Sequence, residues 1–110
     1  MPDKATEVIQ GTLDMLVLKT LALEPMHGFG VAARIEQVSQ NVFRVNAGSL
    51  FVAFQRLHRA GLINSEWRAT ENSRRAKYYA LTTEGRKRLR SETPEWGRQV
   101  AAIARILEAS

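Results

Sequence analysis

The 110-residue sequence contains no cysteine. This absence excludes a disulfide scaffold, a thiolate zinc site and a cysteine nucleophile, and it fits a reducing compartment. Long hydrophobic runs are missing too: the longest apolar stretch, residues 13–23, is about half a membrane span long and contains Asp14 and Lys19. The first residues, Met1 to Lys4, carry no apolar core behind a basic start, so they lack the pattern of a secretion signal. We therefore expect a cytoplasmic protein.

Acidic residues are scarcer than basic ones, and this imbalance indicates a polyanionic partner. The chain has 11 Asp and Glu against 16 Lys and Arg, so its surface favours nucleic acid or an anionic membrane face. No acidic residue lies between Glu36 and Glu66, whereas Arg44, Arg56 and Arg59 all do. A phosphate backbone could approach that segment without local repulsion. The length and the apolar fraction of 45% fit one compact domain.

Motifs that would indicate an enzyme are absent. The sequence has no glycine-rich phosphate loop, no paired His and carboxylate motif and no metal-ligand spacing. Its two histidines, His27 and His58, are far apart in the sequence, and we interpret both as structural or solvent-facing. We expect no catalytic residue, no metal and no cofactor.

Apolar residues at intervals of three and four predict three helices in the first half of the chain. The first covers about residues 6–24 and ends before Pro25, because a proline disfavours helical geometry in the residue that precedes it. The second covers about residues 28–39 and the third about residues 47–60. The residues expected to be buried on the second helix are Phe29, Val31, Ala32, Ile35 and Val38.

The third predicted helix has a two-sided pattern that suits a DNA groove. Asn46 can cap its start, because the side-chain oxygen can accept a free amide of the first turn, and Gly61 can end it in the left-handed conformation. At about 100° per residue, one face is apolar, with Leu50, Ala53, Phe54 and Leu57. The other face carries small, amide and arginine side chains: Gly48, Val52, Gln55, Arg56 and Arg59, with Ser49, Phe51 and His58 at its borders.

Two short runs rich in aromatic and branched residues, 62–68 and 77–82, predict a hairpin of strands. The polar loop between them, 69–76, gives the hairpin a basic tip. We expect Trp67, Tyr78 and Tyr79 to cover the helical core and to pack across the strands, the commoner role of aromatic residues at strand positions. Three helices followed by a hairpin is the order of a winged helix-turn-helix, so the expected fold class is mainly α (α+β) with a two-stranded wing.

The C-terminal segment is predicted to be helical, with Thr83 as its cap. Pro94 lies inside it, so we expect a kinked or broken helix. Its apolar residues form one seam: Leu89, Trp96, Val100, Ile103 and Leu107. One small domain cannot bury this seam unless the helix folds back, so a homodimer explains it better than intramolecular packing, which is the alternative. In the dimer the partner's seam would pack on apolar residues of the first helix: Ile9, Leu13, Leu16 and Val17.

The sequence resembles the PadR family of transcriptional regulators through an ordered set of motifs over about residues 9–107. Similar to the family's opening helix and second turn are Gly11-Thr12-Leu13, Leu16-Val17-Leu18 and His27-Gly28-Phe29. Similar to its recognition helix and the step into the wing are Gly48-Ser49-Leu50-Phe51, Arg56-Leu57 and Gly61-Leu62-Ile63. Similar to its wing and exit are Ser73-Arg74-Arg75-Ala76-Lys77-Tyr78-Tyr79, Leu81-Thr82 and Gly85. Trp96 lies where the family often has an aromatic residue.

The resemblance implies a bacterial transcription regulator, in most cases a repressor, that binds a roughly palindromic operator as a homodimer. Residues 1–82 would form the DNA-binding domain and residues 83–110 the dimerisation helix. In the major groove Gln55 could pair with an adenine edge, and Arg56 or Arg59 with guanine or a phosphate. The complete set of expected DNA contacts is Asn46, Ser49, Phe51, Val52, Gln55, Arg56, Arg59, Arg74, Arg75 and Lys77.

Two departures from the family pattern keep a second function open. The family usually has tyrosine and then proline where this chain has Phe51 and Val52. Phe51 lacks the phenolic hydroxyl, and Val52 presents an apolar group that could touch a thymine methyl. The alternative function is a winged-helix module that binds a protein through the same surface. The resemblance also implies that a small aromatic or cationic effector could bind at Trp96, although a tryptophan that only fills the dimer interface explains this residue equally well.

Overall fold

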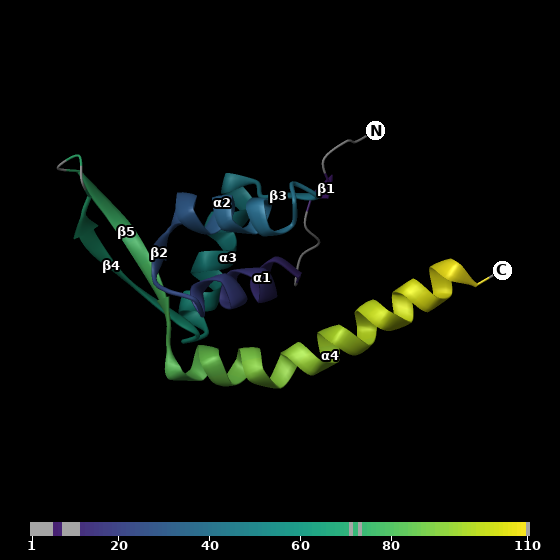
Figure 1. Cartoon of the computed structure of the whole chain (residues 1–110). Coiled ribbons are helices and arrows are strands. Elements are labelled where there is room, and N and C mark those ends of the chain that lie inside the picture. The colour runs from purple at the N-terminus through teal and green to yellow at the C-terminus, as the bar shows by residue number, and fades with distance from the viewer. Residues whose placement is uncertain (1–5, 8–11, 71, 73, 110) are drawn as a thin grey trace.

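Three clustered helices, a projecting hairpin and a long C-terminal helix make up the fold (Figure 1). The computed structural model describes residues 6–7, 12–70, 72 and 74–109. In chain order the elements are β1 (Thr6–Glu7), α1 (Thr12–Leu21), β2 (Met26–His27), α2 (Gly28–Val38), β3 (Phe43–Arg44), α3 (Ala47–Arg59), β4 (Ile63–Ala69), β5 (Arg75–Leu81) and α4 (Thr83–Glu108). The wing, β4 and β5, projects from one side of the helix cluster, and α4 extends past the cluster on the other side. The mainly α winged helix-turn-helix predicted from the sequence is confirmed.

The hydrophobic core lies between the first three helices and the base of the wing. Its buried members are Leu13, Val17, Leu18, Leu21, Val31, Ile35, Leu50, Ala53, Phe54, Leu57, Leu62, Ile63, Tyr79 and Leu81. The apolar face predicted for the third helix is confirmed, since all four of its residues belong to this cluster. On α2, however, Phe29 is 86% exposed and Val38 is 69% exposed, although burial was predicted. The buried stripe runs through Val31 and Ile35; Phe29 lies two residues before Val31, on the other side of the helix, and Val38 is the last helical residue.

The first helix is shorter than predicted. α1 covers Thr12–Leu21 and ends four residues before Pro25. Thr6–Glu7, expected to be helical, forms strand β1 instead and pairs in parallel with β3, Phe43–Arg44. The apolar spacing that predicts a helix begins only at Val8, so the two residues before it had no part in that pattern.

The predicted hairpin is confirmed, and a third strand joins it. β4 and β5 are antiparallel, and the loop between them is shorter than expected, residues 70–74. The two-residue strand β2 pairs with β5, which gives the order β2–β5–β4. Two residues, Met26 and His27, are too few to show an alternating pattern, so β2 could not be predicted from the sequence. Because α2 starts directly after β2, this pairing fixes the start of α2 against the wing.

α4 is one continuous helix of 26 residues with Pro94 inside it, so it is not broken; its ribbon bends partway along (Figure 1). Its cap is Thr82 rather than Thr83. The Thr82 hydroxyl accepts a hydrogen bond from the amide of Gly85 and donates one to the carbonyl of Gly61. Gly61, with φ of 78°, is the left-handed residue predicted after α3. Neither α4 nor any other helix in the described part of the chain combines the length and apolar character needed to cross a membrane.

Candidate nucleic-acid interface

The outer face of α3 is the candidate recognition surface. Asn46 caps the helix as predicted: its Oδ1 accepts a hydrogen bond from the amide of Ser49 at 3.0 Å. The buried face holds α3 on the core, so the other side chains are exposed to solvent: Ser49, Phe51, Val52, Gln55, His58 and Arg59. None of the 13 residues of α3 is acidic. This outer face can therefore approach a phosphate backbone without charge repulsion.

Arg56 does not belong to that outer face, although the sequence placed it there. Its guanidinium forms a bidentate ion pair with Asp14 of α1, with Nη2–Oδ1 at 2.6 Å and Nε–Oδ2 at 3.1 Å. The hydrogen bond to the carboxylate raises the pKa of Arg56, as expected for a charge-assisted pair. The two side chains are partly buried, with Arg56 36% and Asp14 25% exposed. The pair thus connects α1 to α3 and engages two of the five guanidinium N–H groups of Arg56.

One face of the wing is turned toward α3. Tyr79 lies on this face and stacks on Phe54 of α3, with 3.9 Å between the ring centroids. Burial raises the pKa of the Tyr79 hydroxyl. Side chains that lie opposite each other in an antiparallel register point to the same side of the sheet, so Trp67, Arg75 and Lys77 share this side with Tyr79. We call the surface formed by Trp67, Arg75 and Lys77 the α3-side face of the wing.

The packing predicted for the wing aromatics is confirmed for Tyr79, which belongs to the core, and only in part for Tyr78 and Trp67, which pack across the strands but do not belong to the core. Tyr78, on the opposite face, contacts the His27 ring edge-on with the centroids 5.4 Å apart. Trp67 is 57% exposed. It lies opposite Lys77, nearer the hairpin tip than Tyr79, and the described core contains no wing residue that near the tip. The three residues that we call the wing cations are exposed as predicted: Arg74, Arg75 and Lys77.

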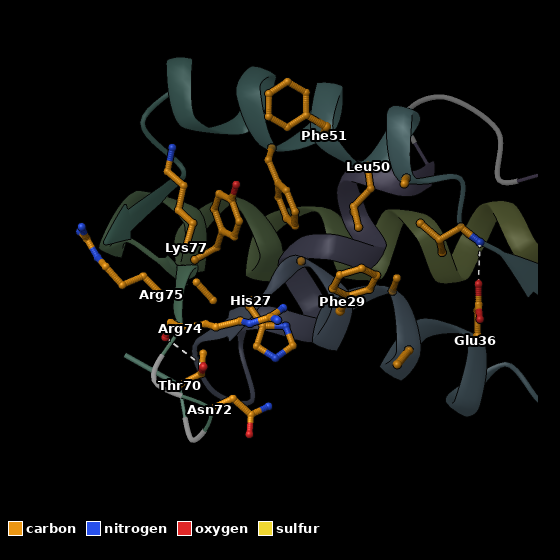
Figure 2. Close-up of a pocket in the computed structure, with 18 residues that line it drawn as sticks. His27, Phe29, Glu36, Leu50, Phe51, Thr70, Asn72, Arg74, Arg75 and Lys77 are labelled. Carbon is orange, nitrogen blue, oxygen red and sulfur yellow. Dashed lines mark hydrogen bonds between the residues drawn. The ribbon is translucent and has the colours of Figure 1, made fainter. Parts of the chain in front are cut away.

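An open cavity of about 830 Å³ lies between α2, α3 and the wing (Figure 2). Phe29 of α2 and Phe51 of α3 line it from the helices, and the wing cations line it from β5 and the residue before it. One acid, Glu36, is among the lining residues, and its carboxylate accepts a hydrogen bond from the amide of Val45 at 3.0 Å. The cavity therefore has an apolar floor and a cationic side.

Two residues that line this cavity, His27 and Phe29, were not predicted from the sequence to belong to the candidate interface. Phe29 was assigned to the core, and only a strict helical period measured from Val31 would have placed it outside. His27 was interpreted as structural, which agrees with its contacts: its Nδ1 accepts a hydrogen bond from the amide of Gly30 at 3.0 Å and so caps α2. Its ring nevertheless lines the cavity beside Phe29.

A second hollow, of about 410 Å³, lies between α3 and the wing. Gln55, His58 and Arg59 line it from the helix, and Ser65 and Lys77 line it from the strands. Lys77 lines both cavities. The hollow thus joins the outer face of α3 to Lys77 on the α3-side face of the wing, and its aromatic base, formed by Phe51, Phe54 and Tyr79, is flanked by polar and basic side chains. This arrangement can accommodate an extended polyanion.

The residues predicted to form a dimer surface fall into three groups. Leu13 and Val17 are 5% and 0% exposed and belong to the core of the single chain, which corrects their predicted assignment to the dimer surface. Leu16 and Leu89 are partly buried against the same core. The outer half of the seam is open to solvent: Val100, Ile103 and Leu107. Intramolecular packing therefore explains the inner part of the seam and leaves the outer part unexplained.

Two more residues were predicted to lie at the dimer surface, Ile9 and Trp96. Ile9 lies outside the described residues. Trp96 is partly buried on α4, and its predicted contact with an effector stays a prediction. Among the residues that the structure describes, no group of three or more His, Cys, Asp or Glu side chains is arranged to hold a metal ion.

Comparison with known proteins gives one family. The family model described as "Transcriptional regulator PadR-like family" matches residues 17–91. The structure of a PadR family transcriptional regulator from Eggerthella lenta is 32% identical, with a TM-score of 0.72, over 92% of this chain and 86% of that one. A PadR family transcription regulator from Clostridium difficile is 26% identical, also with a TM-score of 0.72, over 86% of this chain and 97% of that one. A PadR-like regulator from Bacillus cereus, 21% identical over 92% of this chain and 96% of that one, has the same fold with a TM-score of 0.77.

Proposed function

The chain belongs to the PadR-like family of transcriptional regulators, and from this premise we propose that it is a repressor that binds a roughly palindromic DNA operator as a homodimer. The proposal rests on the surface that α3 forms with the wing. An exposed α3 face without acids continues into the basic face of the wing. Such a surface complements the charge of duplex DNA.

In the proposed complex α3 lies in the major groove. Gln55 pairs with an adenine edge, Arg59 with guanine or a phosphate, and Phe51 and Val52 contact thymine methyl groups. Ser49 and the helix start capped by Asn46 approach a phosphate, which the free amides of the first turn favour. Arg56 is left out of this set because its guanidinium is paired with Asp14.

The wing supplies the second contact in the proposed complex. Arg74, Arg75 and Lys77 bind the flanking phosphate backbone, and their contribution is to affinity and its salt dependence rather than to the choice of sequence. All three side chains are exposed and extend from the wing beside the cavity in Figure 2.

The homodimer is proposed to form through residues 83–110. The outer seam of α4 presents large apolar side chains that the single chain leaves exposed: Val100 at 57%, Ile103 at 56% and Leu107 at 79%. Contiguous exposed apolar side chains of this kind are typical of association surfaces. A two-fold dimer would place two recognition helices on adjacent half-sites about one helical turn, roughly 34 Å, apart, and the operator would mirror that symmetry.

Fluorescence anisotropy tests the proposal. The purified protein is titrated into labelled duplex from upstream of its own gene and into a scrambled duplex of the same composition, over a series of salt concentrations. Tighter binding to the upstream duplex that persists at moderate salt supports a sequence-specific regulator. Equal and steeply salt-dependent binding to both would reduce the surface to a non-specific polyanion site, and no binding at low salt would favour the protein-binding module instead. Run-off transcription from the same duplex then distinguishes repression from activation.

A further inference from the structure

Among the described residues of the wing, Trp67 is the one large aromatic side chain that is mostly exposed to solvent. Its relative exposure is 57%, whereas Tyr79 on the same face is buried and Tyr78 packs on His27. Large exposed apolar side chains are common singly, but an indole costs more to leave in water than most. The exposed indole of Trp67 on the α3-side face is therefore available to a partner from outside the chain.

Two cations lie against the Trp67 ring. The Arg75 guanidinium is 5.4 Å and the Lys77 ammonium 6.0 Å from its centroid, within the range of cation–π attraction. The described strand residues on this face carry no carboxylate; Glu66 lies on the opposite face, where it pairs with Arg68 at 2.9 Å. An apolar ring beside two cations, on a face whose described strand residues carry no carboxylate, fits a partner that is itself both apolar and anionic.

The α3-side face is continuous with the recognition helix. Lys77 of this face also lines the hollow whose other wall is formed by Gln55 and Arg59 of α3. A partner that follows the outer face of α3 into that hollow meets Lys77, whose ammonium lies 6.0 Å from the centroid of the Trp67 ring. A DNA strand leaving the major groove has the required pattern, because it alternates phosphates with the apolar edges of deoxyribose rings.

We propose that Trp67 is a DNA-contacting residue: its indole packs against deoxyribose rings at the edge of the minor groove beside the operator half-site, while Arg75 and Lys77 bind the phosphates on either side. This inference rests on the proposed binding of duplex DNA and adds a contact that depends on the shape of the groove. The indole also holds the two cations on the α3 side before DNA arrives, so less side-chain freedom is lost on binding.

Tryptophan fluorescence with labelled DNA present tests the contact. The chain has two tryptophans, Trp67 and Trp96, so the wild-type protein reports both and Trp67→Phe reports Trp96 alone. Each protein is brought to saturation with upstream duplex, as judged by anisotropy, and acrylamide quenching of the emission is measured with and without DNA. We expect DNA to protect the wild-type emission from acrylamide and to leave the Trp67→Phe emission unchanged.

Binding variants separate the roles of ring and charge. Trp67→Ala is expected to weaken binding about ten-fold, the scale of one aromatic contact, without changing the salt slope. Lys77→Gln is expected to lower the salt slope by about one, since one phosphate contact is lost. Arg68→Gln is the matched control, because it removes one positive charge from the opposite face of the same wing and should leave the slope unchanged. Circular dichroism melting checks that all variants fold.

The outcomes separate this inference from the proposed function. Anisotropy can show that DNA binds while acrylamide protection is equal in the wild type and in Trp67→Phe. The protected emission would then come from Trp96, and the Trp67 contact alone would be overturned. Equal slope changes for Lys77→Gln and Arg68→Gln would overturn the assignment of the contact to the α3-side face. Absence of binding at low salt would overturn both the contact and the proposed function.

Discussion

Asp14 and Arg56 show how a single pair of side chains can hold one helix, α3, against another, α1. The two residues are 42 positions apart, and both oxygens of the carboxylate are engaged by the guanidinium. Because each side chain is partly buried, loss of one partner leaves the other charge in a site with restricted access to water. In the proposed complex, Arg56 would therefore affect DNA binding through the orientation of α3 rather than by contact.

Replacement of Arg56 by glutamine should affect stability more than the salt dependence of DNA binding. We expect Arg56→Gln and Asp14→Asn each to lower the free energy of unfolding by about 1 kcal/mol, and the double variant to lose less than the sum. Urea unfolding of the four proteins measures this coupling. In DNA titrations Arg56→Gln should keep the wild-type salt slope, whereas Arg59→Gln should lower it by about one. If Arg56→Gln lowered the salt slope of DNA binding, Arg56 would have to be counted among the residues that contact DNA.

Tyr79 makes the stability of the fold sensitive to alkaline pH. Its buried hydroxyl has a raised pKa in the folded chain, so the unfolded chain releases the phenolic proton at lower pH, near the usual value of about 10. The contribution of Tyr79 to stability is complete below that value and is lost as the pH rises through the raised pKa. Tyr79→Phe keeps the stack on Phe54 but has no phenolic proton. Between about pH 8 and about pH 11, we expect the free energy of unfolding, measured with urea, to fall less in this variant than in the wild type. An equal fall in both proteins would assign the effect to other groups.

At the scale of elements, the wing and α4 pack closely where they meet. Gly85, in the first turn of α4, is buried, and a Cβ at this position would collide with the main-chain carbonyl of Leu62. Gly97, in the same helix, has nothing within 4 Å of the equivalent position. The two glycines thus differ in packing while sharing a helical backbone.

Alanine at these two positions should have opposite effects. Gly85→Ala is expected to lower the free energy of unfolding by about 1–3 kcal/mol, because the backbone of α4 or of Leu62 must move. Gly97→Ala should raise it by up to about 1 kcal/mol through helix propensity alone. Thermal and urea unfolding of both variants measure the difference. Equal stability of Gly85→Ala and Gly97→Ala would show that the start of α4 can move away from the carbonyl of Leu62 without cost, and would contradict this prediction.

The elements that could be predicted from the sequence are those whose information is local. The third helix was predicted with its cap, its buried face and its end, because Asn46, the apolar stripe and Gly61 all act within a few residues of the helix. The ion pair of Arg56 could not be predicted, since its partner is distant in sequence. Trp67 was assigned to the core because strand periodicity gives the side of a sheet but not how far along a strand the core extends.

At the scale of the whole molecule, the proposed DNA surface and the proposed dimer surface lie at different ends. Figure 1 shows the wing on one side of the helix cluster and the second half of α4 extending from the other. The inner half of α4 packs on α1, and α1 is joined to α3 by the Asp14–Arg56 pair. In the proposed dimer, a change at the interface could therefore be transmitted to α3 through these two contacts, which would supply a physical route for regulation.

A charge placed on the outer seam of α4 should separate the proposed dimer into monomers. Ile103→Glu puts a carboxylate at a position that is 56% exposed in the single chain and buried in the proposed dimer, and we expect it to weaken association at least about thirty-fold. Ala101→Glu is the matched control, since residue 101 is exposed on the other side of the same helix. Sedimentation equilibrium measures association.

The same variant should bind DNA as a monomer, because each monomer still contacts one half-site. We expect Ile103→Glu to bind a single half-site with the affinity of the wild type, and to lose the additional affinity that the dimer has for the complete palindrome. Unchanged association of Ile103→Glu would move the dimer interface away from this seam.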